Sequence, residues 1–252
     1  MRALLGETFR LLAAHLNLFT LISLTVWLPG HVLSNYFEFF EPAPAEPSQS
    51  VRTIFAIAVV FETIVVAAPL VALARIKSGL PVGYAIAMSQ GLAAWGRLLV
   101  VRFVINLTAL PALGVLFAAP AGGLGAMVVG VCLIALAVAL LVRFAVIDAV
   151  VVLEGRNAIT VWRRAAALTA GRRWRIFWTA VTILVTIVLP AALAEWALYR
   201  WPELNHFVVR VLVGCVVAVI QSSLLTIALF LFYWQARGIE GLSSAAGVRA
   251  TS

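Results

Sequence analysis

The sequence predicts an all-α fold, a polytopic membrane bundle of six transmembrane helices with short cytoplasmic interfacial helices. Hydrophobic residues make up 64% of the chain and charged residues 11%, against about 45–50% and about 25% in an ordinary globular domain. The mean hydropathy is +1.09. Several apolar runs reach the roughly 20 residues that a helix needs to cross the hydrocarbon core. We therefore expect residues 1–252 to form one integral membrane domain without a soluble catalytic part.

Six apolar runs follow one another along the chain, separated by polar or glycine-rich connections. The predicted transmembrane helices span about residues 11–33, 51–74, 98–118, 124–145, 176–199 and 207–234, and the predicted cytoplasmic hinges about residues 75–97 and 146–175. His15 and Asn17 interrupt the first run. We expect this run to be a retained helix, and not a cleaved signal peptide.

The connections have distinct compositions. Glycine and proline interrupt residues 79–97 so often that we expect a short helix at the membrane interface there, and not a crossing. Residues 120–123 (PAGG) predict an uncharged turn between the third and fourth crossings. The apolar stretch 124–153 would be roughly 45 Å long as a straight helix. Its part beyond Arg143 must therefore tilt or leave the hydrocarbon.

The distribution of basic residues predicts the orientation. With six crossings, only Arg52, Arg200 and Arg210 of the 18 basic residues fall on one side, so the other 15 share the opposite side. Positively charged loops stay in the cytoplasm. We therefore expect a multi-pass protein of the bacterial cytoplasmic (inner) membrane with both termini cytoplasmic. Because the arginines flank apolar runs instead of forming a basic groove, no nucleic acid is expected as a partner.

The second hinge contains a helix with definable ends. Asn157 is a good N-cap and Gly171 a natural C-terminal cap, which predicts a helix of about thirteen residues between them. One face carries Val161, Trp162, Ala165 and Leu168. We expect this face to meet acyl chains and the arginines to meet lipid phosphates.

The arginines and the tryptophan of this hinge form a predicted surface for lipid, including anionic headgroups, or for another membrane protein. Its residues are Arg156, Arg163, Arg164, Arg172, Arg173, Trp174 and Arg175. The alternative, which we favour at this point, is that the cluster only orients and anchors the chain, since positive-inside sorting produces such clusters.

Four short segments of this hinge carry a family resemblance. They are Val152-Leu153-Glu154-Gly155, Trp162-Arg163-Arg164, Leu168-Thr169-Ala170-Gly171 and Trp174-Arg175-Ile176-Phe177. Together they resemble the signature of the glycerophosphoryl diester phosphodiesterase membrane-domain-like family of six-helix bacterial proteins. In some relatives the membrane part is fused to a soluble phosphodiesterase barrel, which is absent here. The resemblance therefore implies a six-helix fold, and it implies neither a catalytic residue nor a reaction.

Glu62 lies near the middle of the second predicted crossing. An ionisable group at that depth costs several kcal/mol unless it is protonated, paired or hydrated, so it counts as a functional candidate. Asn106, Gln221 and Ser222 are possible partners at comparable depth. The alternative, which we favour at this point, is a neutral Glu62 that links helices by a hydrogen bond.

Known catalytic motifs are missing from the sequence. It shows no Gly-x-Ser-x-Gly elbow, no phosphate-binding Gly-Lys-Ser/Thr loop and no zinc-ligand spacing. We therefore expect no enzyme, no cofactor and no metal. The predicted function is a non-enzymatic accessory or scaffold protein that binds lipid or a membrane partner. The alternative is a small transporter or permease subunit with a polar path around Glu62.

Overall fold

The structure of the protein, a computed structural model, describes residues 2–40, 47–155, 158–201, 203 and 206–250. It is 91% helical, and the described residues include no strand. In chain order the elements are α1 (Arg2–Ala14), α2 (Leu16–Phe40), α3 (Pro47–Lys77), α4 (Tyr84–Arg143), α5 (Ile147–Ala149), the π-helical turn η1 (Val150–Glu154), α6 (Ala158–Thr169), α7 (Arg173–Arg200) and α8 (Phe207–Ala250).

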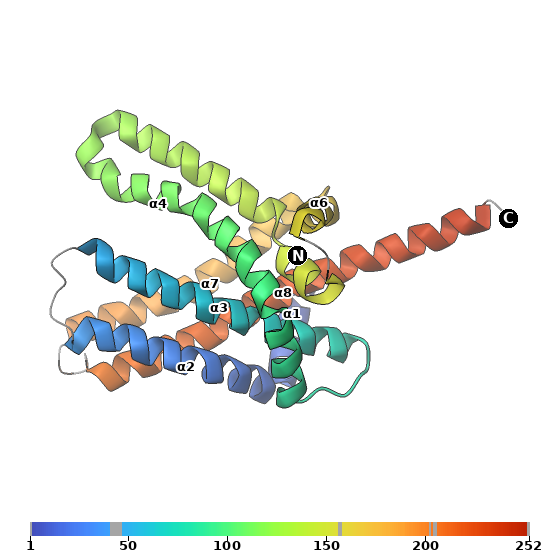
Figure 1. The fold of residues 1–252 in the computed structure, drawn as a ribbon, viewed down its shortest axis with the longest axis horizontal. Helices are drawn as coiled ribbons and strands as arrows, with labels where there is room; N and C mark the ends of the chain where they lie inside the picture. Colours follow the sequence, from blue (N-terminus) through green and yellow to red (C-terminus); the bar gives the residue numbers. More distant parts are fainter. Residues whose placement is uncertain (1, 41–46, 156–157, 202, 204–205, 251–252) are drawn as a thin grey trace.

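Six segments of the described chain are long and apolar enough to cross a membrane, which confirms the predicted helical architecture. They are Leu16–Phe37, Val59–Lys77, Tyr84–Ile105, Val128–Glu154, Arg173–Leu198 and Phe207–Ile239. They belong to three hairpins: α2 with α3, the outgoing and returning arms of α4, and α7 with α8 (Figure 1). A straight α4 would be about 90 Å long at 1.5 Å per residue. Instead, its ribbon reverses direction between the predicted third and fourth crossings.

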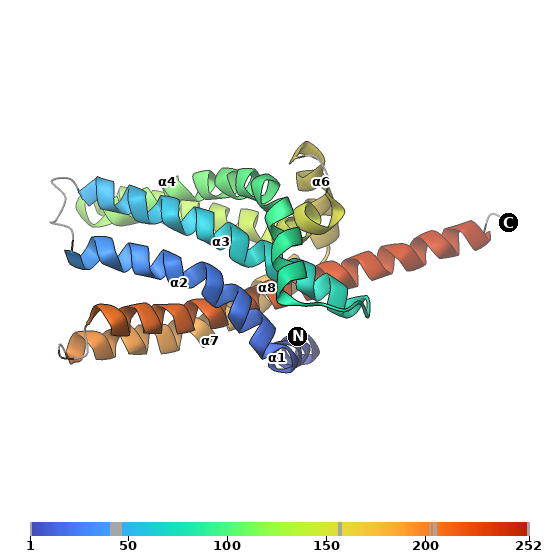
Figure 2. The same ribbon diagram turned by 60° about the horizontal axis from the view of Figure 1, so that its bottom comes forward.

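Short transverse segments gather at one end of the bundle, which we call the hinge end. It holds α1, α6 and the first turns of α4, and the C-terminal part of α8 extends beyond it, away from the bundle (Figures 1 and 2). Lys77 of α3 forms an ion pair with Glu7 of α1 at this end. Arg97 of α4 donates a hydrogen bond to the carbonyl of Gly155, at 3.3 Å. The hinge end is thus a connected layer across the ends of the hairpins.

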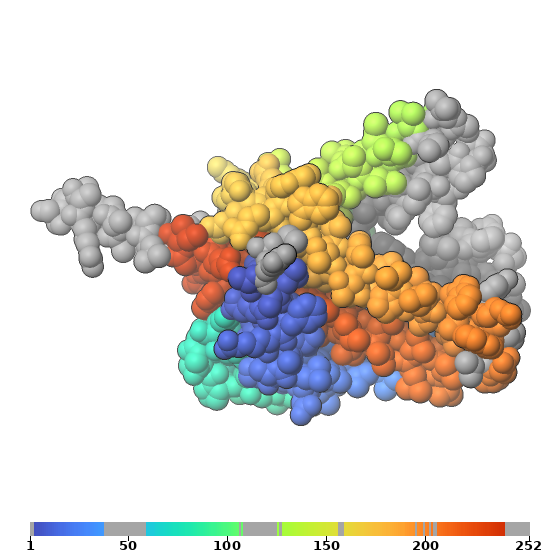
Figure 3. Space-filling model, turned by 180° about the vertical axis from the view of Figure 1, so that it is seen from behind, coloured from blue at the N-terminus to red at the C-terminus, as the bar shows by residue number. Residues whose placement is uncertain are grey.

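Helix α8 forms the centre of the packed core. It contacts α1, α2, α3, α6 and α7, and Ile227, Phe230 and Tyr233 are completely buried. Figure 3 shows α7 and α8 side by side along one face of the molecule, with α1 against them. Helix α8 also contacts α3 and α5, two of the elements that carry the polar residues described below.

The first crossing starts later than predicted. The apolar run that suggested residues 11–33 is divided at His15 into α1 and α2, and the membrane-length segment is Leu16–Phe37. Leu11 and Leu12 pack against the core as part of α1. Their apolar character thus serves a separate amphipathic helix, whose opposite side is exposed.

The interface helix expected in residues 79–97, within the first predicted hinge, is not a separate element. Helix α4 begins at Tyr84 and continues without a break into the third crossing. An ideal Cβ on Gly91 would lie 2.7 Å from the Cα of Ala68, so α3 and α4 approach each other closely at this glycine. The residue that seemed to interrupt a helix therefore serves close helix packing.

The sixth helix is longer than predicted. It was expected to end near residue 234, but α8 continues to Ala250. The polar residues after Gln235 lower the hydropathy, and the helix continues through them without a proline to interrupt it.

The second hinge, predicted for residues 146–175, folds into the protein. After Arg143 the chain turns into α5 and η1, and Val146, Ile147, Val150 and Val151 are almost completely buried. The apolar stretch does leave the line of α4, as its length predicted. This stretch enters the protein core, where neighbouring helices cover it.

Helix α6 has the predicted extent but a different environment. It spans Ala158–Thr169, and Gly171 follows with a φ of +73°, which suits glycine as a C-terminal cap. The predicted N-cap Asn157 lies outside the described residues. The expectation that the apolar face meets acyl chains was wrong, because Val161 and Ala165 are completely buried against the protein. The Thr169 hydroxyl also donates to the carbonyl of Arg143, at 2.7 Å.

Candidate functional site

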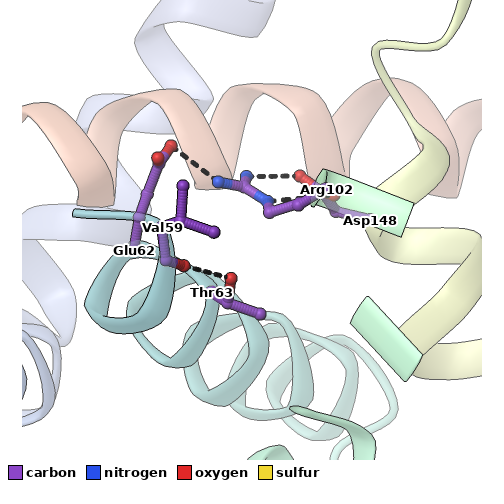
Figure 4. Close-up of polar contacts among 5 residues, drawn as sticks. All are labelled: Val59, Glu62, Thr63, Arg102 and Asp148. Atoms are coloured by element: carbon purple, nitrogen blue, oxygen red, sulfur yellow. Dashed lines mark hydrogen bonds and ion pairs between the residues drawn. The ribbon is translucent and has the colours of Figure 1, made fainter. Parts of the chain in front are cut away.

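Three charged side chains from three elements meet inside the bundle. Arg102 of α4 lies between Glu62 of α3 and Asp148 of α5 (Figure 4). Its Nη1 is 2.6 Å from Glu62 Oε1, its Nη2 is 2.6 Å from Asp148 Oδ2, and its Nε donates to Asp148 Oδ1 at 3.3 Å. We call these three residues the cavity cluster.

The helices bring the cavity cluster together through local sequence features. Arg102 follows Gly91 by about three helical turns, so both lie on the side of α4 that meets α3. On α3, the hydroxyl of Thr63 donates to the Val59 carbonyl at 2.6 Å, so this buried polar group is satisfied beside Glu62 (Figure 4). The turn after Arg143 places Asp148 opposite Arg102. A straight fourth helix would not bring Asp148 to this point.

The two carboxylates of the cavity cluster are held differently. Arg102 donates two hydrogen bonds to Asp148, from Nε and Nη2, and the side chains of both residues are only 16% exposed. Glu62 is held by one nitrogen, and 47% of its side chain is exposed. Two carboxylates and one guanidinium carry a net charge of −1 when all are ionised. The cavity cluster then has one carboxylate more than its arginine neutralises, and Glu62 is the more accessible of the two carboxylates.

Two cavities border the cavity cluster. Their volumes are about 480 Å³ and about 510 Å³, which fall in the range of small-molecule binding sites, about 300–1,000 Å³. Both are lined by Glu62, Arg102, Ala145, Asp148, Leu225 and Leu229. The charged residues of the cavity cluster thus line both cavities.

The first cavity brings together several of the predicted intramembrane residues. Gln221 and Ser222 line it together with Glu62, as do Trp27 and His31 of α2. The Ser222 hydroxyl is already bonded to the carbonyl of Ala218, at 2.7 Å. Asn106 belongs to α4, but its side chain is outside the part of the structure that is described.

Sequence reasoning named Glu62 and missed its partner. Arg102 was counted among the cytoplasmic basic residues, but it lies within the membrane-length segment Tyr84–Ile105. Its position four residues inside the predicted third crossing was the available signal. Asp148 likewise stood in an apolar run. Glu62 does link two helices, α3 and α4, and its partner is the guanidinium of Arg102.

The predicted basic surface divides into inward and outward residues. Arg163, Arg173, Trp174 and Arg175 are exposed, and Arg172 is half-buried. Arg164 faces inward, with its Nε 3.3 Å from Glu154 Oε2, and the hydroxyl of Tyr233 donates to Glu154 Oε1 at 3.2 Å. We call Glu154, Arg164 and Tyr233 the α6 network. Arg156 lies outside the described residues.

Other kinds of site find little support. Among the described residues, no group of three or more His, Cys, Asp or Glu side chains could hold a metal ion. Comparison of the chain with family models, with curated proteins and with solved structures finds no match. The resemblance to the glycerophosphoryl diester phosphodiesterase membrane-domain-like family thus stays a prediction.

Proposed function

We propose that the chain is a non-enzymatic membrane transport protein, or the permease subunit of one, whose substrate path passes the cavity cluster. One observation carries the proposal: Glu62, the more accessible carboxylate of the cavity cluster with a side chain that is 47% exposed, faces two ligand-sized cavities. A charge inside a membrane is costly, and folding alone does not require this one. Arg102 and Asp148 would form a neutral pair without it.

The geometry supports exchange of partners at Glu62. Glu62 can leave Arg102 by breaking a single contact, while the two contacts between Arg102 and Asp148 remain. Arg102 and Asp148 then stay paired, and Glu62 is the residue that exchanges its partner. A ligand that enters either cavity meets the same carboxylate, as a path through the bundle requires.

The transport proposal includes a location and an orientation. The hinge end would face the cytoplasm of a bacterium, with both termini inside and the protein in the inner membrane. Removing Arg102 from the loop count leaves 14 basic residues on that side and three on the other, because Arg102 belongs to the cavity cluster. The charge asymmetry that supports this orientation is thus preserved.

A second candidate is the accessory or scaffold protein that binds lipid or a membrane partner at the hinge end. Its support is the outward set of Arg163, Arg173, Trp174 and Arg175. Trp174 is 69% exposed and stacks on Phe177 with 5.3 Å between ring centroids, an arrangement suited to the headgroup region. We rank it second because orientation alone explains exposed arginines there, whereas orientation does not explain Glu62.

Labelling of an introduced cysteine tests the transport proposal. The free cysteines Cys132 and Cys215 are first replaced by alanine, and Glu62→Cys is made in that background. Right-side-out and inside-out vesicles are then treated with a charged, membrane-impermeant thiol reagent. Val65→Cys is the matched control, since Val65 lies about one turn further along α3 and is completely buried.

We expect labelling at position 62 from at least one aqueous side and protection at position 65. Excess transported substrate would slow the labelling. Complete protection of position 62 from both sides, in a variant that remains folded, would overturn the proposal that an aqueous path reaches the cavity cluster.

A further inference from the structure

The ionisable groups around the two cavities favour a positively charged ligand. Of the residues that line them, only His31, Glu62, Arg102 and Asp148 are ionisable. With a neutral His31 their sum is −1. Because no lining residue supplies a second cation, an entering positive charge would neutralise the site.

The hydrogen-bond geometry disfavours an anion. The Nε, Nη1 and Nη2 atoms of Arg102 all contact carboxylate oxygens. An anionic ligand would have to displace Glu62 or Asp148 from the guanidinium, and the displaced carboxylate would lose its partner in a low-dielectric environment. A cation can approach the exposed side of Glu62 without displacing either carboxylate from Arg102.

The walls favour an organic cation over a metal ion. Hard metal ions need several oxygen ligands in close geometry, and the two cavities are lined mainly by aliphatic side chains. Each cavity also has aromatic rings in its wall, Trp27 and Phe230 in the first and Phe144 and Trp162 in the second. Aromatic faces attract organic cations, and aliphatic walls bind their apolar substituents.

Two side chains that line the first cavity, Trp27 and His31, carry buried polar atoms. Within the described part of the chain, Trp27 Nε1 and His31 Nε2 have no hydrogen-bond partner. Their rings lie 5.4 Å apart on successive turns of α2. Both atoms are buried, so the charged group that a ligand meets in this cavity is the exposed carboxylate of Glu62.

We propose that the substrates of this site are lipophilic organic cations, with Glu62 as their counter-ion. This inference rests on the proposed transport function and specifies its substrate class. The cation would lie against the exposed side of Glu62, its apolar groups between α4, α7 and α8, while Arg102 keeps its contacts with Asp148.

A pair of probes with the same shape and opposite charge tests this inference. The full-length protein is placed in nanodiscs of zwitterionic lipid, and the binding of radiolabelled tetraphenylphosphonium and tetraphenylborate is measured by equilibrium dialysis against empty nanodiscs. The variants are Glu62→Gln, Glu62→Asp and Glu203→Gln, the last removing an exposed carboxylate far along the chain from the cavity cluster.

We expect saturable binding of tetraphenylphosphonium and none of tetraphenylborate. Glu62→Gln should weaken binding of the cation about tenfold or more, since it removes the counter-ion from an apolar site. Glu62→Asp should keep part of the affinity, and Glu203→Gln all of it. Thermal unfolding of each variant shows that the protein is folded.

Three results would overturn the substrate class: no saturable binding of the cation, equal binding of both probes, or unchanged affinity in Glu62→Gln. The transport proposal can fail separately. If position 62 is labelled from water but the cation does not bind, the path stands and the substrate class is wrong. If the cation binds through Glu62 but position 62 is protected from both aqueous sides, the site binds cations without belonging to a transport path.

Discussion

The cavity cluster and the α6 network are both built from an arginine and a carboxylate, yet their surroundings differ. In the cavity cluster the Glu62 side chain is 47% exposed and borders two cavities. In the α6 network the Glu154 side chain is 10% exposed, and none of its three residues lines either cavity. The α6 network accordingly has the features of a structural connection, and the cavity cluster those of a binding site.

An ion pair inside a membrane protein is therefore not by itself a sign of function. The α6 network connects η1, α6 and α8, segments far apart in the sequence, and its Tyr233 is completely buried. The cavity cluster has one carboxylate more than its arginine neutralises. Excess charge next to open volume is the feature that separates the two.

The largest effect is expected from Arg102→Ala. This change leaves Asp148, whose side chain is 16% exposed, and Glu62 without their cation. Breaking a buried ion pair from one side costs about 3–5 kcal/mol, which should appear as a lower free energy of unfolding in detergent. The double variant Arg102→Met with Asp148→Leu should recover most of this loss, because the cavities can hydrate the remaining Glu62. A double variant no more stable than the single one would contradict this explanation.

A smaller loss is expected when the α6 network is broken. Arg164→Ala should lower the free energy of unfolding by about 1–3 kcal/mol, because the largely buried carboxylate of Glu154 loses a charged partner. Arg163→Ala is the matched control on the same helix, since Arg163 is exposed. The affinity for tetraphenylphosphonium should not change in either variant. A clear loss of affinity in Arg164→Ala would remove the distinction between the two groups.

The close approach of α3 and α4 allows a test with two glycines of one helix. Gly91→Ala should destabilise the protein by about 1–3 kcal/mol, since the added methyl group would lie 2.7 Å from backbone atoms of Ala68. Gly96→Ala meets no atom within 4 Å and should be neutral or slightly stabilising. Thermal unfolding of both variants measures the difference. Equal effects would mean that Gly91 does not set the distance between the helices that carry Glu62 and Arg102.

The smallest effect on stability is expected at the outward basic residues. Replacing Arg163, Arg173 and Arg175 by glutamine should change the free energy of unfolding by about 0.5 kcal/mol or less per site, because all three are exposed. Mass spectrometry of co-purified lipid should show at most a modest decrease of anionic lipid. Loss of one defined lipid or protein partner would instead favour the scaffold candidate over the transporter.

Hydropathy was sufficient to predict the six crossings, and it failed where two apolar environments look alike. The C-terminal end of α6 followed from local chemistry, as Gly171 shows with its positive φ. Whether its apolar face meets lipid or protein could not be predicted, because Val161 and Ala165 would suit both environments equally well. The first and third crossings were predicted to start near residues 11 and 98, whereas α2 begins at Leu16 and α4 at Tyr84.

The candidate site was predictable only in part. Glu62 stood out because a carboxylate interrupts an apolar run. Its pairing with Arg102, and the pairing of Arg102 with Asp148 46 residues further along the chain, depend on long-range packing that no local pattern reveals. The cavities depend on the same packing, so Trp27 and His31 could not be assigned to the site from sequence.

If the cavity cluster binds a ligand while the α6 network stabilises the fold, one matched substitution in each group should separate binding from stability. Glu62→Gln and Glu154→Gln each remove one negative charge by the same chemical change, and both the free energy of unfolding and the affinity for tetraphenylphosphonium are measured on the same preparations. Glu62→Gln should lose affinity and keep stability, because Arg102 and Asp148 remain a neutral pair. Glu154→Gln should lose stability and keep affinity, because Arg164 loses its carboxylate. The same pattern of losses in both variants would contradict the claim.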